Sequence, residues 1–265
     1  MIATPLGRHA PALEAVRSLL AKSGRREQGR FAIEGATMLA EALAAGHEPL
    51  AVYGTQRGLA GLASVAGADA IGSERLFAID DRTMARLSDL ETPPGLLAVL
   101  PVRLASLDDV LSDGKPALVL AGVADPGNAG TLLRSAEIFG IRQAIFARES
   151  VEPHNPKVIR ATMGAAFRMT VAVADAGDLV TSARTHGYEI VAATSDGTPL
   201  PEFRFAARTL VAIGNERHGV AWLTHYDRGI TIPQRGEGES LNASVAGSII
   251  LYAFSQQDER KILQS

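Results

Sequence analysis

The polar residues best suited to bind a ligand or assist a reaction follow three predicted apolar strands. After the first strand, 118–123, come Asp125 and Asn128, and Arg134 lies six residues beyond Asn128. On a helix, which rises 1.5 Å per residue, Asn128 and Arg134 would lie about 9 Å apart along the axis. A guanidinium is essentially never deprotonated, so Arg134 could bind a phosphate or a developing oxyanion but could not act as a base. The structural alternatives are a helix N-cap for Asn128 and a surface salt bridge to Glu137 or Asp125 for Arg134.

The second strand, 210–213, runs into Gly214 and then Glu216. A carboxylate at this point could accept a proton from a reacting group. It could equally orient Arg134, Asn242 or the backbone of its own loop, and the sequence leaves both roles open.

The third strand, 230–232, ends at Pro233, and a glycine-containing polar loop follows. Ser240, Asn242 and Ser244 then open an apolar helix at 245–254. Each of these side chains could accept a hydrogen bond from a free backbone N–H group at the start of the helix. One helix end does not need three such groups, so some of them are available to hold a ligand.

The elements that must position these residues alternate from Ala117 onwards. Short, uninterrupted apolar runs are typical of strands buried on both faces of a parallel sheet. The expected strands are 118–123, 144–146, 189–193, 210–213 and 230–232, with helices at 131–139, 157–164 and 179–186. The predicted fold class is therefore α/β, with helices on both faces of the sheet. No G-x-G-x-x-G and no P-loop follows any strand, which excludes the usual dinucleotide and Walker-type sites.

The first 100 residues form a separate pattern of short helices and strands, which predicts a small N-terminal α/β domain at 1–100. The segment 101–116 is bounded by prolines and is predicted to be a linker to the domain 117–265. A chain of 265 residues is long enough for two such domains.

Composition limits the kinds of chemistry available. The chain has no cysteine, so it can form neither a disulfide nor a thiolate metal site, and its six histidines lack metal-ligand spacing. It shows no secretory segment and no apolar run of membrane-spanning length, so we expect a cytoplasmic protein without a membrane or a metal. The net charge is −3, but between Arg17 and Arg30 five basic residues face one acid, Glu27. This local basic patch could bind phosphates although the whole chain is acidic.

The three polar stretches resemble, in order, the signature motifs of the SpoU (TrmH-type) RNA 2'-O-methyltransferases. The family patterns are N-x-G-x-x-x-R, G-x-E-x-x-G and I-P…S-L-N-x-S-x-A. The matching residues are Asn128, Gly130 and Arg134; Gly214, Glu216 and Gly219; and Ile232, Pro233, Ser240, Leu241, Asn242, Ser244 and Ala246. No motif position departs from its pattern, and the motifs extend across about half of the chain.

The resemblance implies methyl transfer from S-adenosyl-L-methionine to a ribose 2'-hydroxyl, in a parallel-sheet domain whose C-terminal part forms a trefoil knot. It implies cofactor binding at Thr194, Gly214, Ile232, Leu241 and Ala246. It places the catalytic group at Asn128, Arg134, Glu216, Ser240 and Asn242. It also implies a homodimer packed through the knot region, which fits a final helix that is apolar nearly all round.

The N-terminal run from Gly24 to Gly35 resembles the ribosomal-protein-like substrate-binding domain of one SpoU subgroup. We expect RNA contacts from Arg25, Arg26 and Arg30 here, and from Lys157 and Arg160 in the second domain. The extra domain favours ribosomal RNA as the substrate. The alternatives are a transfer-RNA 2'-O-methyltransferase and a non-catalytic RNA- or ribosome-binding protein with the same fold.

Overall fold

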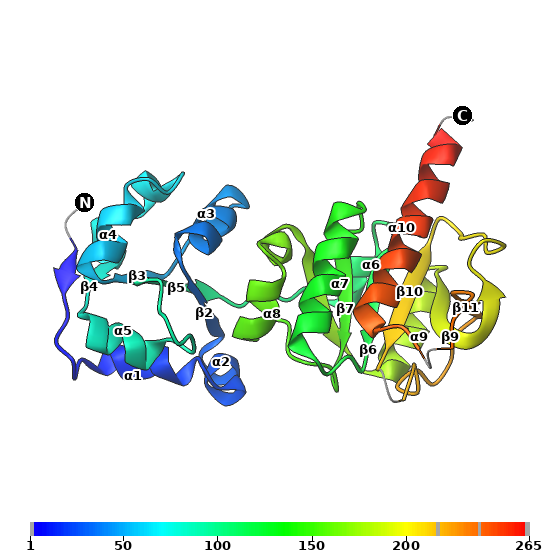
Figure 1. The fold of residues 1–265 in the computed structure, drawn as a ribbon, viewed down its shortest axis with the longest axis horizontal. Coiled ribbons are helices and arrows are strands. Elements are labelled where there is room, and N and C mark those ends of the chain that lie inside the picture. The colour runs from blue at the N-terminus through cyan, green and yellow to red at the C-terminus, as the bar shows by residue number, and fades with distance from the viewer. Residues whose placement is uncertain (1–2, 216–217, 238–239, 263–265) are drawn as a thin grey trace. The chain divides into compact units, whose positions relative to one another are not determined.

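A computed structural model describes residues 3–215, 218–237 and 240–262, and it divides into two compact units. Unit 1 contains Met1–Arg103 together with His154–Phe167, and unit 2 contains Leu104–Pro153 and Arg168–Ser265 (Figure 1). The chain therefore passes between the units three times. No described helix is both long enough and apolar enough to cross a membrane.

Unit 1 is built on a mixed sheet of five strands in the order β1-β4-β3-β5-β2. The strands are β1 (Thr4–Pro5), β2 (Arg30–Glu34), β3 (Ala51–Gly54), β4 (Leu76–Ala78) and β5 (Leu96–Pro101). Strand β5 runs antiparallel to both of its neighbours, β2 and β3. The helices are α1 (Pro11–Ser18), α2 (Lys22–Gln28), α3 (Ala36–Ala44), α4 (Gln56–Leu62), α5 (Asp81–Leu87) and α8 (Pro156–Ala161).

Strand β2 connects the two hydrophobic layers of unit 1, because successive side chains of a strand point to opposite faces. Phe31 and Ile33 belong to a cluster that includes Ile159 and Phe167 from the later segment of the unit. Ala32 belongs to the other cluster, which contains buried side chains of α1 and α5. The expected N-terminal α/β domain is present, but its core includes residues from 154–167.

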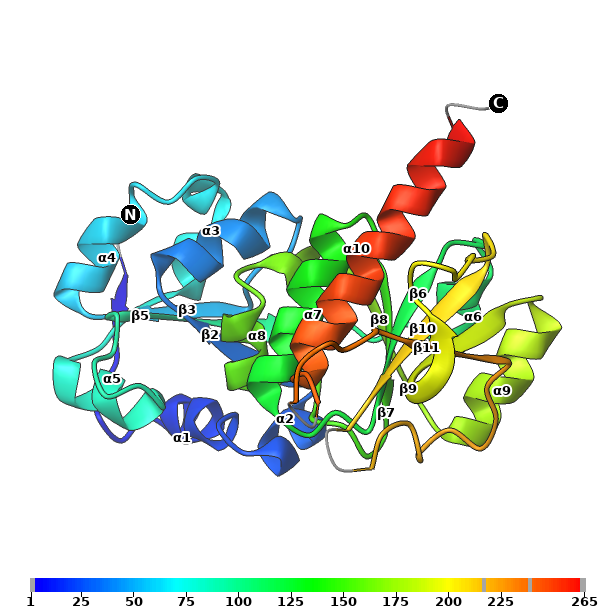
Figure 2. The same ribbon diagram turned by 45° about the vertical axis from the view of Figure 1, so that its right-hand side comes forward.

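Unit 2 is built on a parallel sheet of six strands in the order β11-β9-β10-β6-β7-β8. The strands are β6 (Ala117–Ala121), β7 (Gln143–Ala147), β8 (Thr170–Ala174), β9 (Glu189–Pro199), β10 (Thr209–Gly214) and β11 (Arg228–Thr231). The helices are α6 (Leu107–Leu111), α7 (Pro126–Ile138), α9 (Ala176–Thr185) and α10 (Ala243–Ile262). Helices α7 and α10 pack together on one face, and α6 and α9 cover the other (Figure 2). The predicted α/β class with a parallel sheet is confirmed.

Three elements differ from the sequence-based expectation. Strand β8 was not predicted; its five residues contain only valine and alanine as apolar side chains. Helix α8 ends at Ala161 instead of reaching 164, because Met163 and Gly164 both have positive φ, 51° and 93°, and so break the helix. Within 101–116, helix α6 forms and buries Val110 and Leu111 in the core of unit 2.

Candidate active site and RNA-binding surface

A pocket of about 300 Å³ lies at the carboxyl ends of β10 and β11, beside the middle of β9 and the start of α10. In open α/β sheets, ligands bind at this end of the strands, near the point where the strand order reverses. Here the order reverses between β6 and β10, since β7 and β8 lie on one side of β6 and β9 to β11 lie on the other. The lining includes aliphatic side chains and polar groups; among the latter are Thr194, Ser195, Asn215, Gln234 and Ser240.

The five residues predicted to bind the cofactor all line this one pocket: Thr194, Gly214, Ile232, Leu241 and Ala246. Thr194 comes from β9, Gly214 from β10 and Ile232 from just after β11, while Leu241 and Ala246 flank the start of α10. The second and third polar stretches of the sequence are thus brought to a common place. Ser195, expected beside Thr194 in the wall of the pocket, also lines it; Asn215 lines it too and was not predicted, although it is the immediate neighbour of Gly214.

Gly214 ends β10 in a tight turn. A Cβ atom at this position would lie 2.1 Å from the carbonyl oxygen of Gly219, which is far inside van der Waals contact. The turn is fixed by two hydrogen bonds of 2.8 Å, in which the backbone N–H of Asn215 and that of Gly219 each donate to the other residue's carbonyl. Only glycine fits position 214 without moving this turn. Glu216, the predicted proton acceptor, lies outside the described residues.

Thr194 carries a buried hydroxyl oxygen that has no hydrogen-bond partner among the described residues. An unmade hydrogen bond at a buried group costs about 1–3 kcal/mol, so a buried hydroxyl is expected to find a partner in a bound molecule or a water. Because Thr194 also lines the pocket, its hydroxyl is a natural donor or acceptor for a bound molecule.

Asn242 links the first and third motifs. Its side-chain oxygen accepts from the Ser244 backbone N–H at 2.9 Å and from the Ser244 hydroxyl at 2.7 Å, so Asn242 caps α10. Its amide nitrogen donates to the side-chain oxygen of Asn128 at 3.0 Å. The expectation that Asn128 caps its own helix is wrong: Asp125 is the N-cap of α7, and it accepts from the Asn128 backbone N–H at 2.7 Å. The Asn128 side chain is therefore directed to Asn242.

Arg134 is exposed in the middle of α7 and makes no hydrogen bond or ion pair with another described residue. The two acids considered as its partners are engaged elsewhere. Glu137 accepts from Arg168 at 2.8 Å, and Asp125 caps the helix. The guanidinium is therefore available to an external anion.

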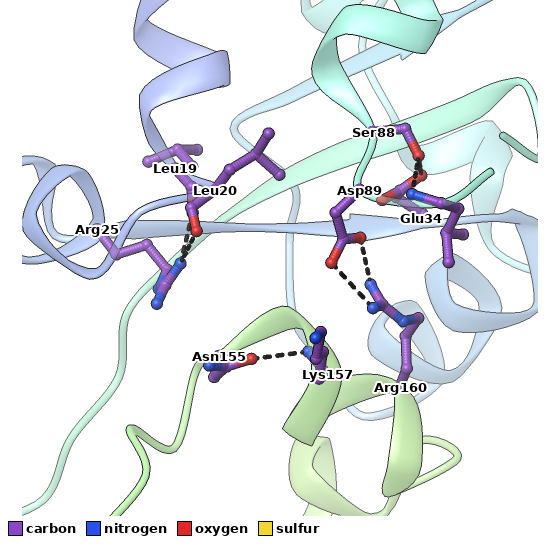
Figure 3. Close-up of polar contacts among 10 residues, drawn as sticks. Leu19, Leu20, Arg25, Glu34, Ser88, Asp89, Asn155, Lys157 and Arg160 are labelled. Atoms are coloured by element: carbon purple, nitrogen blue, oxygen red, sulfur yellow. Dashed lines mark hydrogen bonds and ion pairs between the residues drawn. The ribbon is translucent and has the colours of Figure 1, made fainter. Parts of the chain in front are cut away.

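Arg25, predicted to contact RNA, has a structural role instead. The residue is 2% exposed, and its guanidinium donates to the carbonyl oxygens of Leu19 and Leu20 at 2.7 and 3.0 Å. These carbonyls follow the end of α1 and lack helical partners, so Arg25 satisfies them (Figure 3). The sequence could not separate Arg25 from its neighbour Arg26, because only packing decides which of the two points inward.

The other four predicted RNA contacts divide into two kinds. Arg160 forms a two-pronged ion pair with Asp89, with nitrogen–oxygen distances of 2.7 and 3.0 Å (Figure 3). Arg26, Arg30 and Lys157 are exposed, and none of them forms an ion pair within the described residues. We refer to these three residues as the basic surface.

Two carboxylates, those of Asp89 and Glu34, lie near Arg160. Burial raises the pKa of Glu34, which accepts a hydrogen bond from the Ser88 hydroxyl and lies near Asp89. Burial acts in the same direction on Asp89, but the hydrogen bonds and the charge of Arg160 outweigh it and hold the Asp89 pKa below its usual value. The contacts of Asp89 with Arg160 therefore favour its charged form.

The parallel sheet, the pocket at its carboxyl edge and the polar groups gathered there define an α/β enzyme domain that binds a small ligand. Residues 115–252 match the family model described as the SpoU rRNA Methylase family, and residues 10–98 match the MRM3-like substrate binding domain. The chain belongs to the SpoU rRNA methylase family of RNA methyltransferases.

Individual relatives agree with this assignment. The chain is 30% identical over 197 residues to the 23S rRNA (uridine(2479)-2'-O)-methyltransferase of Streptomyces viridochromogenes, covering 71% of this chain and 69% of that protein. A solved RNA 2'-O ribose methyltransferase is 27% identical, with a TM-score of 0.77, over 97% of this chain and 100% of that one. An AdoMet-bound rRNA methyltransferase from Sinorhizobium meliloti shares the fold, with a TM-score of 0.83 at 24% identity over 96% and 98% of the two chains.

Proposed function

We propose that the protein transfers a methyl group from S-adenosyl-L-methionine to a ribose 2'-hydroxyl in ribosomal RNA. The observation that carries this proposal is the pocket in unit 2, where residues of the second and third motifs meet and Asn242 reaches the first motif through Asn128. The names of the relatives favour ribosomal RNA over transfer RNA as the substrate.

The chemistry of the pocket fits this cofactor. Ile232, Leu241 and Ala246 offer apolar surface to the adenine ring, and backbone groups at Gly214, Ile232 and Leu241 can read its polar edge. The unpartnered hydroxyl of Thr194 can serve a polar group of the ligand. When bound, the cofactor supplies an electrophilic methyl group, so the protein has to align the acceptor oxygen and assist loss of its proton.

We assign this work to the candidate catalytic residues. Arg134 binds a phosphate next to the target ribose and stabilises the negative charge that develops on the 2'-oxygen. Asn128, Ser240 and Asn242 position the ribose and the loop that holds it. Glu216 is the candidate proton acceptor, since a guanidinium cannot take that role at physiological pH.

The basic surface, Arg26, Arg30 and Lys157, holds the RNA through its phosphates. Its three cations form no ion pair with the part of the chain that the structure describes, which supports this role because they can replace counterions on a nucleic acid.

We also propose that residues 214–246 form the trefoil knot of the family and that the protein is a cytoplasmic homodimer. After β11, at one edge of the sheet, the chain must return to α10, which packs on β10 and α7 in the interior, and this path supports a knot. Val245, Ile249 and Tyr252 recur at helical spacing on α10 and are 47%, 37% and 52% exposed. Such an apolar stripe supports packing against a second copy.

Two measurements test the proposal. Calorimetry should detect binding of S-adenosyl-L-methionine, and a tritiated methyl group should pass to large-subunit ribosomal RNA from cells that lack the protein. A protein that binds this RNA but neither binds the cofactor nor transfers the label would instead be the non-catalytic ribosome-associated alternative.

A further inference from the structure

We propose that residues 154–167, which lie outside the matched substrate-binding domain, form part of the RNA-binding surface of unit 1 and that the Asp89–Arg160 ion pair positions Lys157 on it. This inference rests on the proposed RNA substrate, and it assigns Arg160 a positioning role in place of the direct RNA contact expected from the sequence.

The first support is that residues 154–167 are built into unit 1. The segment leaves unit 2 after β7 and returns at β8, yet Ile159 and Phe167 are buried with Phe31 and Ile33 of β2. The imidazole Nε2 of His47 lies 3.0 Å from the carbonyl oxygen of Phe167, which adds a polar contact to this packing. The segment therefore moves with the substrate-binding sheet.

The second support is the position of α8 beside β2. Strand β2 is the edge strand of its sheet, and an exposed edge needs a cover to prevent pairing with other chains. Helix α8 packs against it, and the His154 ring, just before the helix, lies 4.6 Å from the Phe31 ring. Arg30 begins the same strand, so α8 brings Lys157 to the element that carries Arg30.

The third support is that α8 depends on outside contacts for its orientation. A helix of six residues is not stable alone, so tertiary contacts must hold it. Arg160 provides the fixed contact, because its planar guanidinium meets both oxygens of Asp89 in one geometry. Lys157 lies three residues earlier, as a neighbour on the helix surface, and stays exposed while the charge of Arg160 is matched (Figure 3).

The decisive variant is Asp89→Asn, because the two interpretations predict effects of opposite sign. If charge alone matters, removing an acid near the basic surface should strengthen RNA binding or leave it unchanged. If Asp89 positions α8, binding of an unmethylated large-subunit ribosomal RNA transcript should weaken by about fivefold, the equivalent of about 1 kcal/mol. The KM for RNA should rise while kcat at saturating RNA stays near that of the unmodified protein.

Glu27→Gln is the matched control, since Glu27 is an exposed acid on α2 beside Arg26. Removing this charge should strengthen RNA binding or leave it unchanged. Stronger or unchanged binding by Asp89→Asn as well would overturn the positioning role.

Lys157→Ala tests the contact itself and changes only an exposed side chain. The dependence of log affinity on log salt should become shallower by about 0.7–0.9, which corresponds to one lost phosphate contact. In the Asp89→Asn background the same substitution should cost much less, since the lysine is already displaced. Fully additive effects, or an unchanged salt dependence, would contradict the proposal.

Cofactor binding distinguishes a failure of the proposed methyltransferase function from a failure of the proposed RNA-binding surface. Calorimetry with S-adenosyl-L-methionine reports on unit 2, so all three variants should keep the affinity of the unmodified protein. If the unmodified protein bound the cofactor but the Lys157 and Asp89 variants bound RNA with unchanged affinity, the proposed RNA-binding role of residues 154–167 would be wrong. The assignment as a methyltransferase would not be affected. If the unmodified protein bound neither cofactor nor RNA, the proposed function and the proposed RNA-binding surface would both be wrong.

Discussion

The role of a side chain in this protein depends on its burial and on whether nearby residues already bind its possible partners. Arg134 is available because Glu137 pairs with Arg168 and Asp125 caps α7. Arg25 and Arg26 are adjacent in sequence, yet the first is buried among carbonyls and the second is exposed. Residue type and spacing predicted these positions as candidates, but burial and pairing decide which of them can meet a substrate.

Arg134→Lys tests the arginine at this scale. Lysine keeps the positive charge but loses the planar fork that binds two oxygens together. We expect kcat/KM for RNA methylation to fall by about tenfold or more, the effect of losing about 1.4 kcal/mol of transition-state stabilisation. The affinity for S-adenosyl-L-methionine should not change, and near-normal methylation would exclude two-pronged recognition.

Glu34→Gln tests the partly buried carboxylate of unit 1. Because burial raises the pKa of Glu34 in the folded state, that state holds the proton more tightly than the unfolded chain, whose glutamate titrates near 4.5. Stability must therefore fall as pH rises from about that value through the folded-state pKa. The amide oxygen of the variant can still accept a hydrogen bond from Ser88. The variant should therefore be more stable than the unmodified protein at neutral pH, whereas at a pH below the ordinary glutamate pKa it should have no such advantage. Denaturant titrations across this range measure the difference, and equal stability at neutral pH would contradict the expectation.

At the scale of elements, the site depends on where strands end and α10 begins. The ends of 118–123, 210–213 and 230–232 were predicted close to their observed positions, because apolar runs stop where polar groups start. The sequence could not supply the strand order, since β9 and β10 lie on the opposite side of β6 from β7 and β8. It also could not show that Asn242 caps α10 while its amide group reaches Asn128.

Gly214→Ala tests the turn after β10. The new Cβ would overlap the carbonyl of Gly219, and such overpacking costs typically 1–3 kcal/mol. We expect cofactor affinity in calorimetry to fall by about tenfold. Gly236→Ala is the matched control, because that glycine lies in the same C-terminal region with no atom near its added Cβ. Equal effects of the two substitutions would show that close approach at 214 is unimportant.

Asn242→Ala removes both the cap of α10 and the link to α7. Loss of the cap alone should cost about 1 kcal/mol of unfolding free energy. Asn242→Ser can keep the cap but is too short to keep the bond to Asn128, so it should recover stability in thermal melts without recovering methylation. If Asn242→Ser restored both, the link between the motifs would have no catalytic value.

At the scale of the whole molecule, composition and periodicity predicted two α/β regions and a cytoplasmic protein, and the motif resemblance predicted an enzyme, but neither showed which residues share a core. The helical pattern at 157–164 gave no sign that its apolar side pairs with β2, a strand more than a hundred residues earlier. Contacts between distant segments of this kind have no local signature, so only the folded structure reveals them.

The proposed dimer is tested by Ile249→Glu on α10. Ile249 lies in the exposed stripe, so a charge there should be tolerated by a monomer but not within an apolar interface. Sedimentation velocity should show the unmodified protein as a dimer and the variant as a monomer with unchanged circular dichroism. If the unmodified protein and the variant were both monomers, the proposed dimer would be wrong.

The three passages of the chain between its units restrict how such proteins can exchange parts. A fragment ending at Arg103 would lack Ile159 and Phe167 and would present Phe31 and Ile33 to water. A chimera that takes its amino-terminal region from one relative and the remainder from another would therefore have to carry 154–167 with the first piece. Recombination at a single junction near 103 should give insoluble protein, whereas transplanting both segments together should give a folded chimera whose RNA preference follows the donor.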